Sequence, residues 1–210
     1  MGNTENEMLE KRFLNLMRTY TDDETYIAEC WKEIYASYTG KSRYYHNLGH
    51  LNNMISELNE IESSVTELDT ILFSIYYHDI VYKSTETDNE YQSAKLFEKR
   101  ISNTHFPKIQ NCYKQIEATK EHKTSVDKDT NILLDLDLSI LGKDKSEYQE
   151  YCSNIRKEYS IYPDSMYHPG RKKALNHLLE LDVIFKTDYF FDKYEEKARK
   201  NMAFELSQLN

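Results

Sequence analysis

The chain has few helix-breaking residues and no apolar run long enough to cross a membrane. Only five Gly and three Pro occur in 210 residues. Most segments carry apolar residues at three- and four-residue spacing, which favours helix throughout. The acidic first seven residues lack the basic-then-apolar order of a secretory signal, and no apolar stretch approaches the ~20 residues that a bilayer requires. We therefore predict an all-α, cytoplasmic protein with no membrane partner.

Cysteines and dense basic runs are also scarce. Three widely spaced cysteines lie in helix-like patterns without a Cys-x-x-Cys motif. This arrangement suits reduced, buried thiols better than a disulfide framework or a cysteine zinc site. The formal charge of -9, with no basic run, argues against a nucleic-acid duplex as partner but leaves room for a local basic pocket.

Length and composition indicate one folded domain. A chain of 210 residues can bury a full core, and 39% hydrophobic with 30% charged residues is ordinary for a soluble protein. We find no internal repeat, low-complexity tract or linker. We therefore predict a single irregular helical bundle over residues 1–210, and the Tyr-rich helices are compatible with a homodimer.

Capping residues mark the starts of several predicted helices. Asp22 or Asp23 can cap the second helix, Gly40 can end it, and Tyr35 belongs to its predicted apolar face. Ser and Thr stand three residues before Glu in Ser64-x-x-Glu67 and Thr87-x-x-Glu90, which is the capping-box pattern.

The last third of the chain is predicted to contain a proline-rich loop between helices. The loop is expected to pass through Pro163 and Pro169-Gly170. A helix with apolar residues between 174 and 184 should follow it, and a final helix is expected over about 192–209.

A His and an Asp lie side by side where an apolar, helix-like run ends, in Ile75-Tyr76-Tyr77-His78-Asp79-Ile80. Burying two adjacent polar groups without partners is costly, so they should bond to each other, to water or to an ion. Four more residues lie beside or inside apolar helical stretches: His46, His50, Asp135 and Asp137. Imidazole with carboxylate suits Mn, Zn, Fe, Ni, Co or Mg better than Ca. The alternative is that these groups only tie helices together.

The order of these residues, and the strings around them, resemble one family. The strings are Arg43-x-Tyr45-His46-Asn47-Leu48-x-His50, His78-Asp79-x-Val81-Tyr82, Asn89-Glu90-x-x-Ser93-Ala94, Thr119-x-x-His122 and Asp135-Leu136-Asp137-Leu138-x-x-Leu141-Gly142. They look like a small bacterial subfamily of predicted metal-dependent phosphohydrolases in the HD-domain superfamily. The resemblance covers about Arg43 to Leu209. It implies an HD-type helical bundle with a metal-site core at about 43–142 and a helical C-terminal part at 143–210.

The resemblance implies a divalent metal ion held by His50, His78, Asp79 and Asp137. His50 is preferred to His46 because it leads directly into an apolar helix; His46 is then an alternative ligand, a supporting group or a phosphate-binding group. Asp135 is the alternative to Asp137, or forms hydrogen bonds between helices. His122 matches a position where larger HD sites gain ligands for a second metal, although an exposed His near a helix end fits equally well.

The resemblance also implies hydrolysis of a small phosphate ester, such as a nucleotide or related phosphomonoester. A metal ion in such a site polarises a phosphoryl oxygen and lowers the pKa of a bound water toward ~7. Asp79 and Glu90 are the catalytic candidates, with Glu90 as general base or water-orienting residue. Some relatives place a catalytic Glu soon after the doublet, where this chain has Val81, Tyr82 and Lys83.

A phosphate substrate needs cationic groups, and guanidinium groups can grip phosphate through paired hydrogen bonds. The candidates are Arg43, Arg156, Arg171 and Arg199, with surface ion pairs as the alternative. Tyr45, Tyr82 and Tyr159 are candidates for stacking on a base or donating to phosphate. A second hypothesis is a non-catalytic HD module that binds a nucleotide as a sensor.

Overall fold

The computed structural model describes residues 2–209 and confirms the predicted all-α class. These residues form ten α-helices and two short 3₁₀ helices, with no β-strand among them. They divide into two compact units, one ending at Glu121 and the other beginning at His122, and each unit is described below by itself. Residues 1 and 210, the outer bounds of the predicted single domain, lie outside the described residues, and the single domain stays a prediction.

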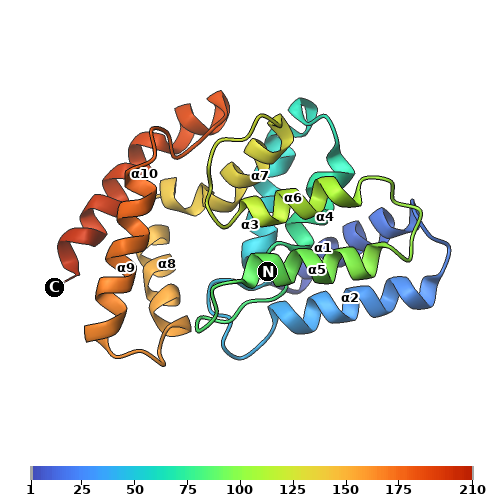
Figure 1. Cartoon of the computed structure of the whole chain (residues 1–210), viewed down its shortest axis with the longest axis horizontal. Helices are drawn as coiled ribbons and strands as arrows, with labels where there is room; N and C mark the ends of the chain where they lie inside the picture. The colour runs from blue at the N-terminus through green and yellow to red at the C-terminus, as the bar shows by residue number, and fades with distance from the viewer. Residues whose placement is uncertain (1, 210) are drawn as a thin grey trace. The chain divides into compact units, whose positions relative to one another are not determined.

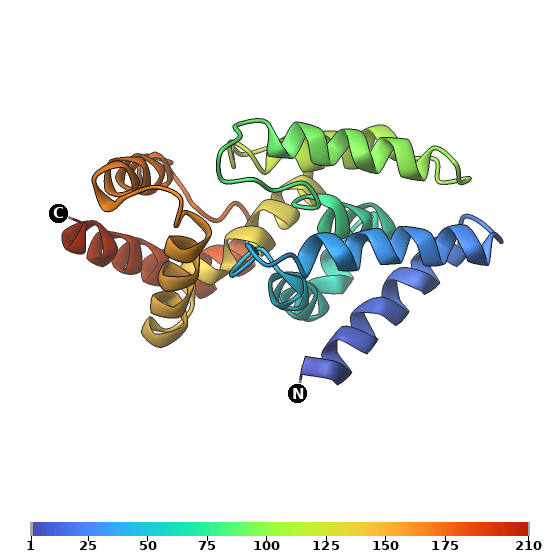
Figure 2. The same ribbon diagram turned by 90° about the horizontal axis from the view of Figure 1, so that it is seen from below.

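The first unit is a set of helices wrapped around a buried one (Figure 1). In chain order it contains α1 (Gly2–Arg18), α2 (Glu24–Tyr38), α3 (Leu48–Ile61), η1 (Glu62–Ser64), α4 (Leu68–Tyr77), α5 (Asn89–Ile101) and α6 (Ile109–Ala118). Figure 2 shows α1 and α2 diverging from the short connection at residues 19–23, and α5 and α6 lie side by side. Over residues 2–209, no helix combines the length and apolar character that a bilayer span needs.

Helix α4 is almost entirely buried, since every residue from Thr70 to Tyr77 is inaccessible or nearly so. Its Tyr76 hydroxyl donates to a backbone carbonyl of α1 at 2.9 Å. Its Ser74 hydroxyl donates to Gln115 of α6 at 2.7 Å, and the Tyr77 ring packs edge-on against Phe97 of α5. Neighbours on three sides therefore fix the helix that ends at the His-Asp doublet.

The second unit contains α7 (Lys128–Leu138), η2 (Ser139–Gly142), α8 (Lys145–Glu158), α9 (Asp164–Leu179) and α10 (Asp188–Gln208). Gly142 lies so close to the Tyr194 side chain of α10 that a Cβ would overlap it. The Asn201 amide of α10 donates to the carbonyls of Leu141 and Lys143 at 2.9 and 3.0 Å. The absence of a side chain at Gly142 thus lets η2 pack tightly against α10.

Both predicted capping boxes are wrong. Helix α4 begins after Glu67, which makes no capping bond and pairs with Lys108 instead, so Ser64 is not its cap. Helix α5 begins after Asp88, one residue later than the box requires. The Asp88 carboxylate accepts from the Gln92 amide at 2.8 Å. By contrast, Asp23 caps α2 as predicted, accepting from the Tyr26 N–H at 2.9 Å.

One expectation about α2 is confirmed and one fails. Helix α2 ends at Tyr38 with Thr39 as its C-cap, so Gly40 stands just past the helix end, where a terminating glycine is expected. Tyr35 is 47% exposed, although its spacing places it beside the buried face. The border of an apolar stripe is poorly defined by spacing alone, and a tyrosine there can keep its hydroxyl in water.

The predicted loop through Pro169-Gly170 is also wrong, because α9 runs from Asp164 through Pro169 to Leu179. Proline removes one intrahelical hydrogen bond. Tertiary contacts offset that loss: the Arg171 guanidinium binds Glu205, and the Tyr167 ring lies against the Arg156 guanidinium at 4.6 Å. The helix then stops before Ile184, whose N–H donates to Glu195.

Candidate metal centre

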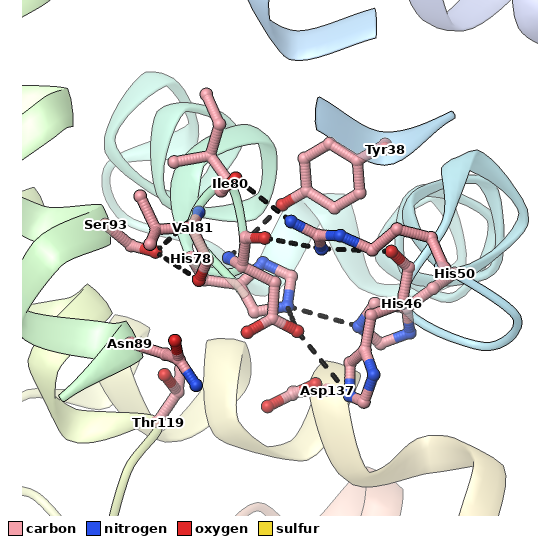
Figure 3. A network of polar contacts seen from close by, with 12 residues as sticks. Tyr38, His46, His50, His78, Ile80, Val81, Asn89, Ser93, Thr119 and Asp137 are labelled. Carbon is pink, nitrogen blue, oxygen red and sulfur yellow. Dashed lines mark hydrogen bonds and ion pairs between the residues drawn. The ribbon is translucent and has the colours of Figure 1, made fainter. Parts of the chain in front are cut away.

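Four predicted site residues from two segments of the first unit meet at one place. The Nε2 atoms of His50 and His78 lie 3.1 Å apart. The Asp79 carboxylate oxygen Oδ2 lies 3.3 Å from Nε2 of His78 and 3.8 Å from Nε2 of His46. Figure 3 shows the three imidazoles facing this point. The His50 and His78 side chains are buried, and His46 is partly exposed.

Hydrogen bonds at the start of α3 and at the end of α4 fix the backbone that carries these side chains. Asn47 caps α3: its side chain accepts from the Gly49 N–H at 2.7 Å and donates to the Tyr44 carbonyl at 2.8 Å. This cap places His46 just before α3 and His50 in its first turn. His78 is the C-cap of α4, with its N–H donating to the Ser74 carbonyl at 2.8 Å.

The contact of His78 Nδ1 decides which ring nitrogen carries the proton. Nδ1 lies 2.8 Å from the Ile75 carbonyl oxygen, which can only accept, so Nδ1 carries the proton. In the neutral ring Nε2 then presents a lone pair toward His50 and Asp79. A backbone carbonyl on the far nitrogen is the usual way in which proteins fix a metal-binding imidazole.

This arrangement fits a divalent metal ion. With His78 neutral, its Nε2 lone pair and the Asp79 oxygen lie 3.3 Å apart as two potential ligand atoms, and a cation bound by both stabilises such a pair. Ligand atoms bound about 2.1 Å from one ion at tetrahedral or octahedral angles lie roughly 3.0 to 3.4 Å apart. The separations of 3.1 and 3.3 Å fall within that range. His50 and His78 belong to a group of side chains whose ligand atoms lie close enough together to hold a metal ion.

Backbone contacts that the sequence did not reveal hold the segment after the doublet. The Asp79 N–H donates to the Tyr38 hydroxyl at 3.2 Å. Farther along, Ser93 bonds both backbone groups of Val81, and the Asn89 amide bonds both backbone groups of Lys83. Ser93 and Asn89 stand in a string that carried the resemblance, whereas nothing in the sequence distinguished Tyr38 from other helix-face residues.

Glu90 lies in the first turn of α5, next to Asn89, with intermediate exposure. Its neighbour Asn89 bonds the backbone of Lys83, which lies four residues after Asp79, so the start of α5 is held next to the segment that follows the doublet. Its role as general base stays a prediction.

The second unit contains the other acidic and imidazole candidates. His122 Nε2 lies 3.0 Å from Asp137 Oδ2. The backbone of His122 has a φ of 49°, a left-handed conformation that residues with a Cβ rarely adopt. Because Asp137 belongs to the second unit, its role as a further ligand stays a prediction.

Asp135 makes the structural contacts that were its alternative interpretation. Its two oxygens accept from the Lys186 N–H, the Thr187 N–H and the Thr187 hydroxyl, each at 2.8 Å. Burial raises the pKa of this carboxyl to about 6, against the lowering effect of those donors. Asp135 therefore ties α7 to the connection before α10.

The four predicted phosphate-binding arginines all have partners within their own unit. Arg43 donates to backbone carbonyls of the first unit. Arg156 binds Asp164 and two carbonyls, Arg171 binds Glu205, and Arg199 binds Glu195 and three carbonyls. Tyr82 is similarly engaged, since His46 stacks on its ring at 4.0 Å and Arg43 lies over it at 5.3 Å.

No family model, curated protein or solved structure matches this chain.

Proposed function

We propose that this chain is a metal-dependent hydrolase that cleaves a small phosphate ester, such as a nucleotide or related phosphomonoester. One observation supports it above the others: Nε2 of His78 lies 3.3 Å from the Asp79 carboxylate and 3.1 Å from Nε2 of His50. These are ligand atoms that a divalent cation accepts, and an imidazole–carboxylate set is typical of hydrolytic metal sites.

In this proposal His50, His78 and Asp79 hold the ion, with Asp137 as the further ligand that the resemblance implies. The donor set suits Mn, Zn, Fe, Ni, Co or Mg. When bound, such an ion supplies Lewis acidity toward a phosphoryl oxygen and acidifies water.

The chain's own residues then orient the reaction. The Ile75 carbonyl keeps the proton of His78 on Nδ1, so that Nε2 stays a ligand. His46, which is partly exposed, is the proposed donor to a phosphoryl oxygen, and Glu90 is the proposed acceptor of the water's proton. We omit Arg156, Arg171 and Arg199 as phosphate-binding groups, because carboxylates and carbonyls already engage them.

Elemental analysis of the purified protein tests the metal site. Wild type should carry near-stoichiometric metal, and His78→Ala and Asp79→Asn should lose it. His105→Ala is the matched control, because it removes an exposed imidazole of the same unit. Equal metal in all four proteins would show adventitious binding and contradict the proposed site.

A phosphomonoesterase and phosphodiesterase screen with added manganese, nickel or cobalt tests the reaction. We expect phosphate release by wild type and His105→Ala, and none by Asp79→Asn with an unchanged circular dichroism spectrum. A fully active Asp79→Asn protein would defeat the proposal. A nucleotide that raises the melting temperature of metal-loaded wild type, without turnover of any substrate, would favour the sensor function instead.

A further inference from the structure

Arg43 connects the two segments that carry the cluster. Its Nη1 donates to the carbonyl of His46 at 3.1 Å and to the carbonyl of Asp79 at 2.7 Å. Its Nη2 donates to the carbonyl of Ile80 at 3.0 Å. One guanidinium thus bonds the backbone before α3 and the backbone after α4, and Figure 3 shows these bonds beside the labelled His46 and Ile80.

Two tyrosine rings hold the Arg43 side chain in this position. Its guanidinium carbon lies 5.2 Å from the centroid of Tyr38 and 5.3 Å from that of Tyr82. Both distances are within the range of cation–π attraction. Tyr38 acts a second time, because its hydroxyl accepts from the Asp79 N–H at 3.2 Å. The peptide groups on both sides of the Asp79 Cα are therefore fixed, one by Tyr38 and one by Arg43.

We infer that Arg43 is a positioning residue of the metal centre, which fixes the backbone of Asp79 and His46 so that their side chains face one point. The inference rests on the proposed function, because it concerns the site proposed to hold the ion. It also replaces the role expected from the sequence, in which Arg43 binds phosphate.

The two roles make opposite predictions for lysine at this position. A lysine keeps the positive charge, so Arg43→Lys should retain much of a phosphate-binding function. An ammonium is a compact donor and cannot reproduce a planar fork that reaches three carbonyls. If Arg43 positions the ligands, Arg43→Lys and Arg43→Met should therefore lose zinc affinity to a similar extent.

Zinc titration by calorimetry on metal-free protein separates these roles. We expect both Arg43 variants to bind zinc roughly 10- to 100-fold more weakly than wild type, the usual effect of losing a group that orients ligands. The control is Arg100→Met. It removes a guanidinium of the same unit that donates to both carboxylate oxygens of Glu33, at 2.7 and 2.8 Å. Unchanged zinc affinity in Arg43→Lys, with weaker binding of inorganic phosphate only in Arg43→Met, would overturn the inference.

Amide hydrogen exchange gives a readout that needs no metal. In metal-free protein the amides of Asp79 and Val81 should exchange roughly tenfold faster in both Arg43 variants, because the hydrogen bonds that hold this backbone are lost. The same amides in Arg100→Met should match wild type. Exchange in the Arg43 variants equal to that in Arg100→Met would overturn the inference. A wild type that binds no zinc would overturn the proposed function, and the exchange comparison would still decide what Arg43 does.

Discussion

Each unit of the molecule buries a cluster of polar side chains, and the two clusters differ in how their hydrogen bonds are satisfied. In the second unit, Arg171 donates to both oxygens of Glu205 at 2.7 and 3.0 Å, and the Tyr148 hydroxyl donates to the same carboxylate at 2.5 Å. The positive charge of Arg171 is therefore paired with the negative charge of Glu205. In the first unit, Nδ1 of His78 donates to the Ile75 carbonyl, and its Nε2 lies 3.3 Å from the Asp79 carboxylate with no arginine or lysine among the contacts described for that carboxylate.

The difference distinguishes a structural cluster from the one that we propose binds a metal ion, called the binding cluster below. A buried ion pair with matched donors is complete from the chain alone. Burial alone would raise the pKa of Glu205, but the hydrogen bonds and charge of Arg171 outweigh it and lower that pKa. The His–Asp cluster offers imidazole and carboxylate ligand atoms to a cation, and this is why we propose chemistry for it and not for the Arg171–Glu205 pair.

The largest expected effect tests the structural cluster. Arg171→Met leaves the Glu205 charge buried without its partner and should destabilise the second unit by about 3 to 5 kcal/mol. Urea unfolding measures the loss, and hydrogen exchange should localise it to residues 145–209. The double variant that also carries Glu205→Leu should recover part of it, because no charge is then left unpaired. Arg18→Met, which breaks an exposed pair with Glu24, should change little, and an equal loss in both arginine variants would contradict the comparison.

The next effect tests the binding cluster. Zinc or manganese at 100 times its dissociation constant should stabilise wild type by about 2.7 kcal/mol, since it binds the folded state only. The expected result is a higher melting temperature for wild type and for His105→Ala, and no rise for His78→Ala. A comparable rise in His78→Ala would place the stabilising ion elsewhere.

Acid should act on the structural cluster through Glu205. The pKa of this carboxyl is lowered from its ordinary value of 4.5, so its stabilisation is present above that pH and is lost as pH falls through the folded-state pKa. Unfolding measured from pH 6 down to pH 3 should show wild type losing stability relative to Glu205→Gln below about 4.5. A constant difference between the two proteins would show that Glu205 does not titrate with folding.

The sequence predicted the helical class and much of the first-unit cluster, because both depend on local patterns. Apolar spacing identifies α3 and α4, and the Asn47 cap and the apolar run to Tyr77 place His50 and His78 at helix ends. His46, His50, His78 and Asp79 could therefore be named from the sequence as candidate ligands.

Contacts between distant segments were beyond the reach of sequence patterns. Arg43 is predicted to bind phosphate because an isolated arginine shows its charge and not its acceptors, which include carbonyls 36 and 37 residues away. Pro169 is predicted in a loop because local propensity carries no information about the Arg171–Glu205 pair that stabilises the same helix. For Pro169, tertiary contacts overrode a local preference.

The smallest effect tests how tightly the binding cluster is held. Tyr38→Phe removes the hydroxyl that accepts from the Asp79 N–H, so a buried donor loses its partner at a cost of about 1 to 3 kcal/mol. We expect a modest loss of stability and a several-fold weaker affinity for zinc, smaller than the loss in Arg43→Lys because Arg43 still holds the Asp79 carbonyl. Tyr35→Phe is the matched control, since it removes an exposed hydroxyl from the same helix. Zinc affinity equal to wild type in Tyr38→Phe would mean that the Asp79 carbonyl contact alone positions the carboxylate, and Arg43 would then carry that role without Tyr38.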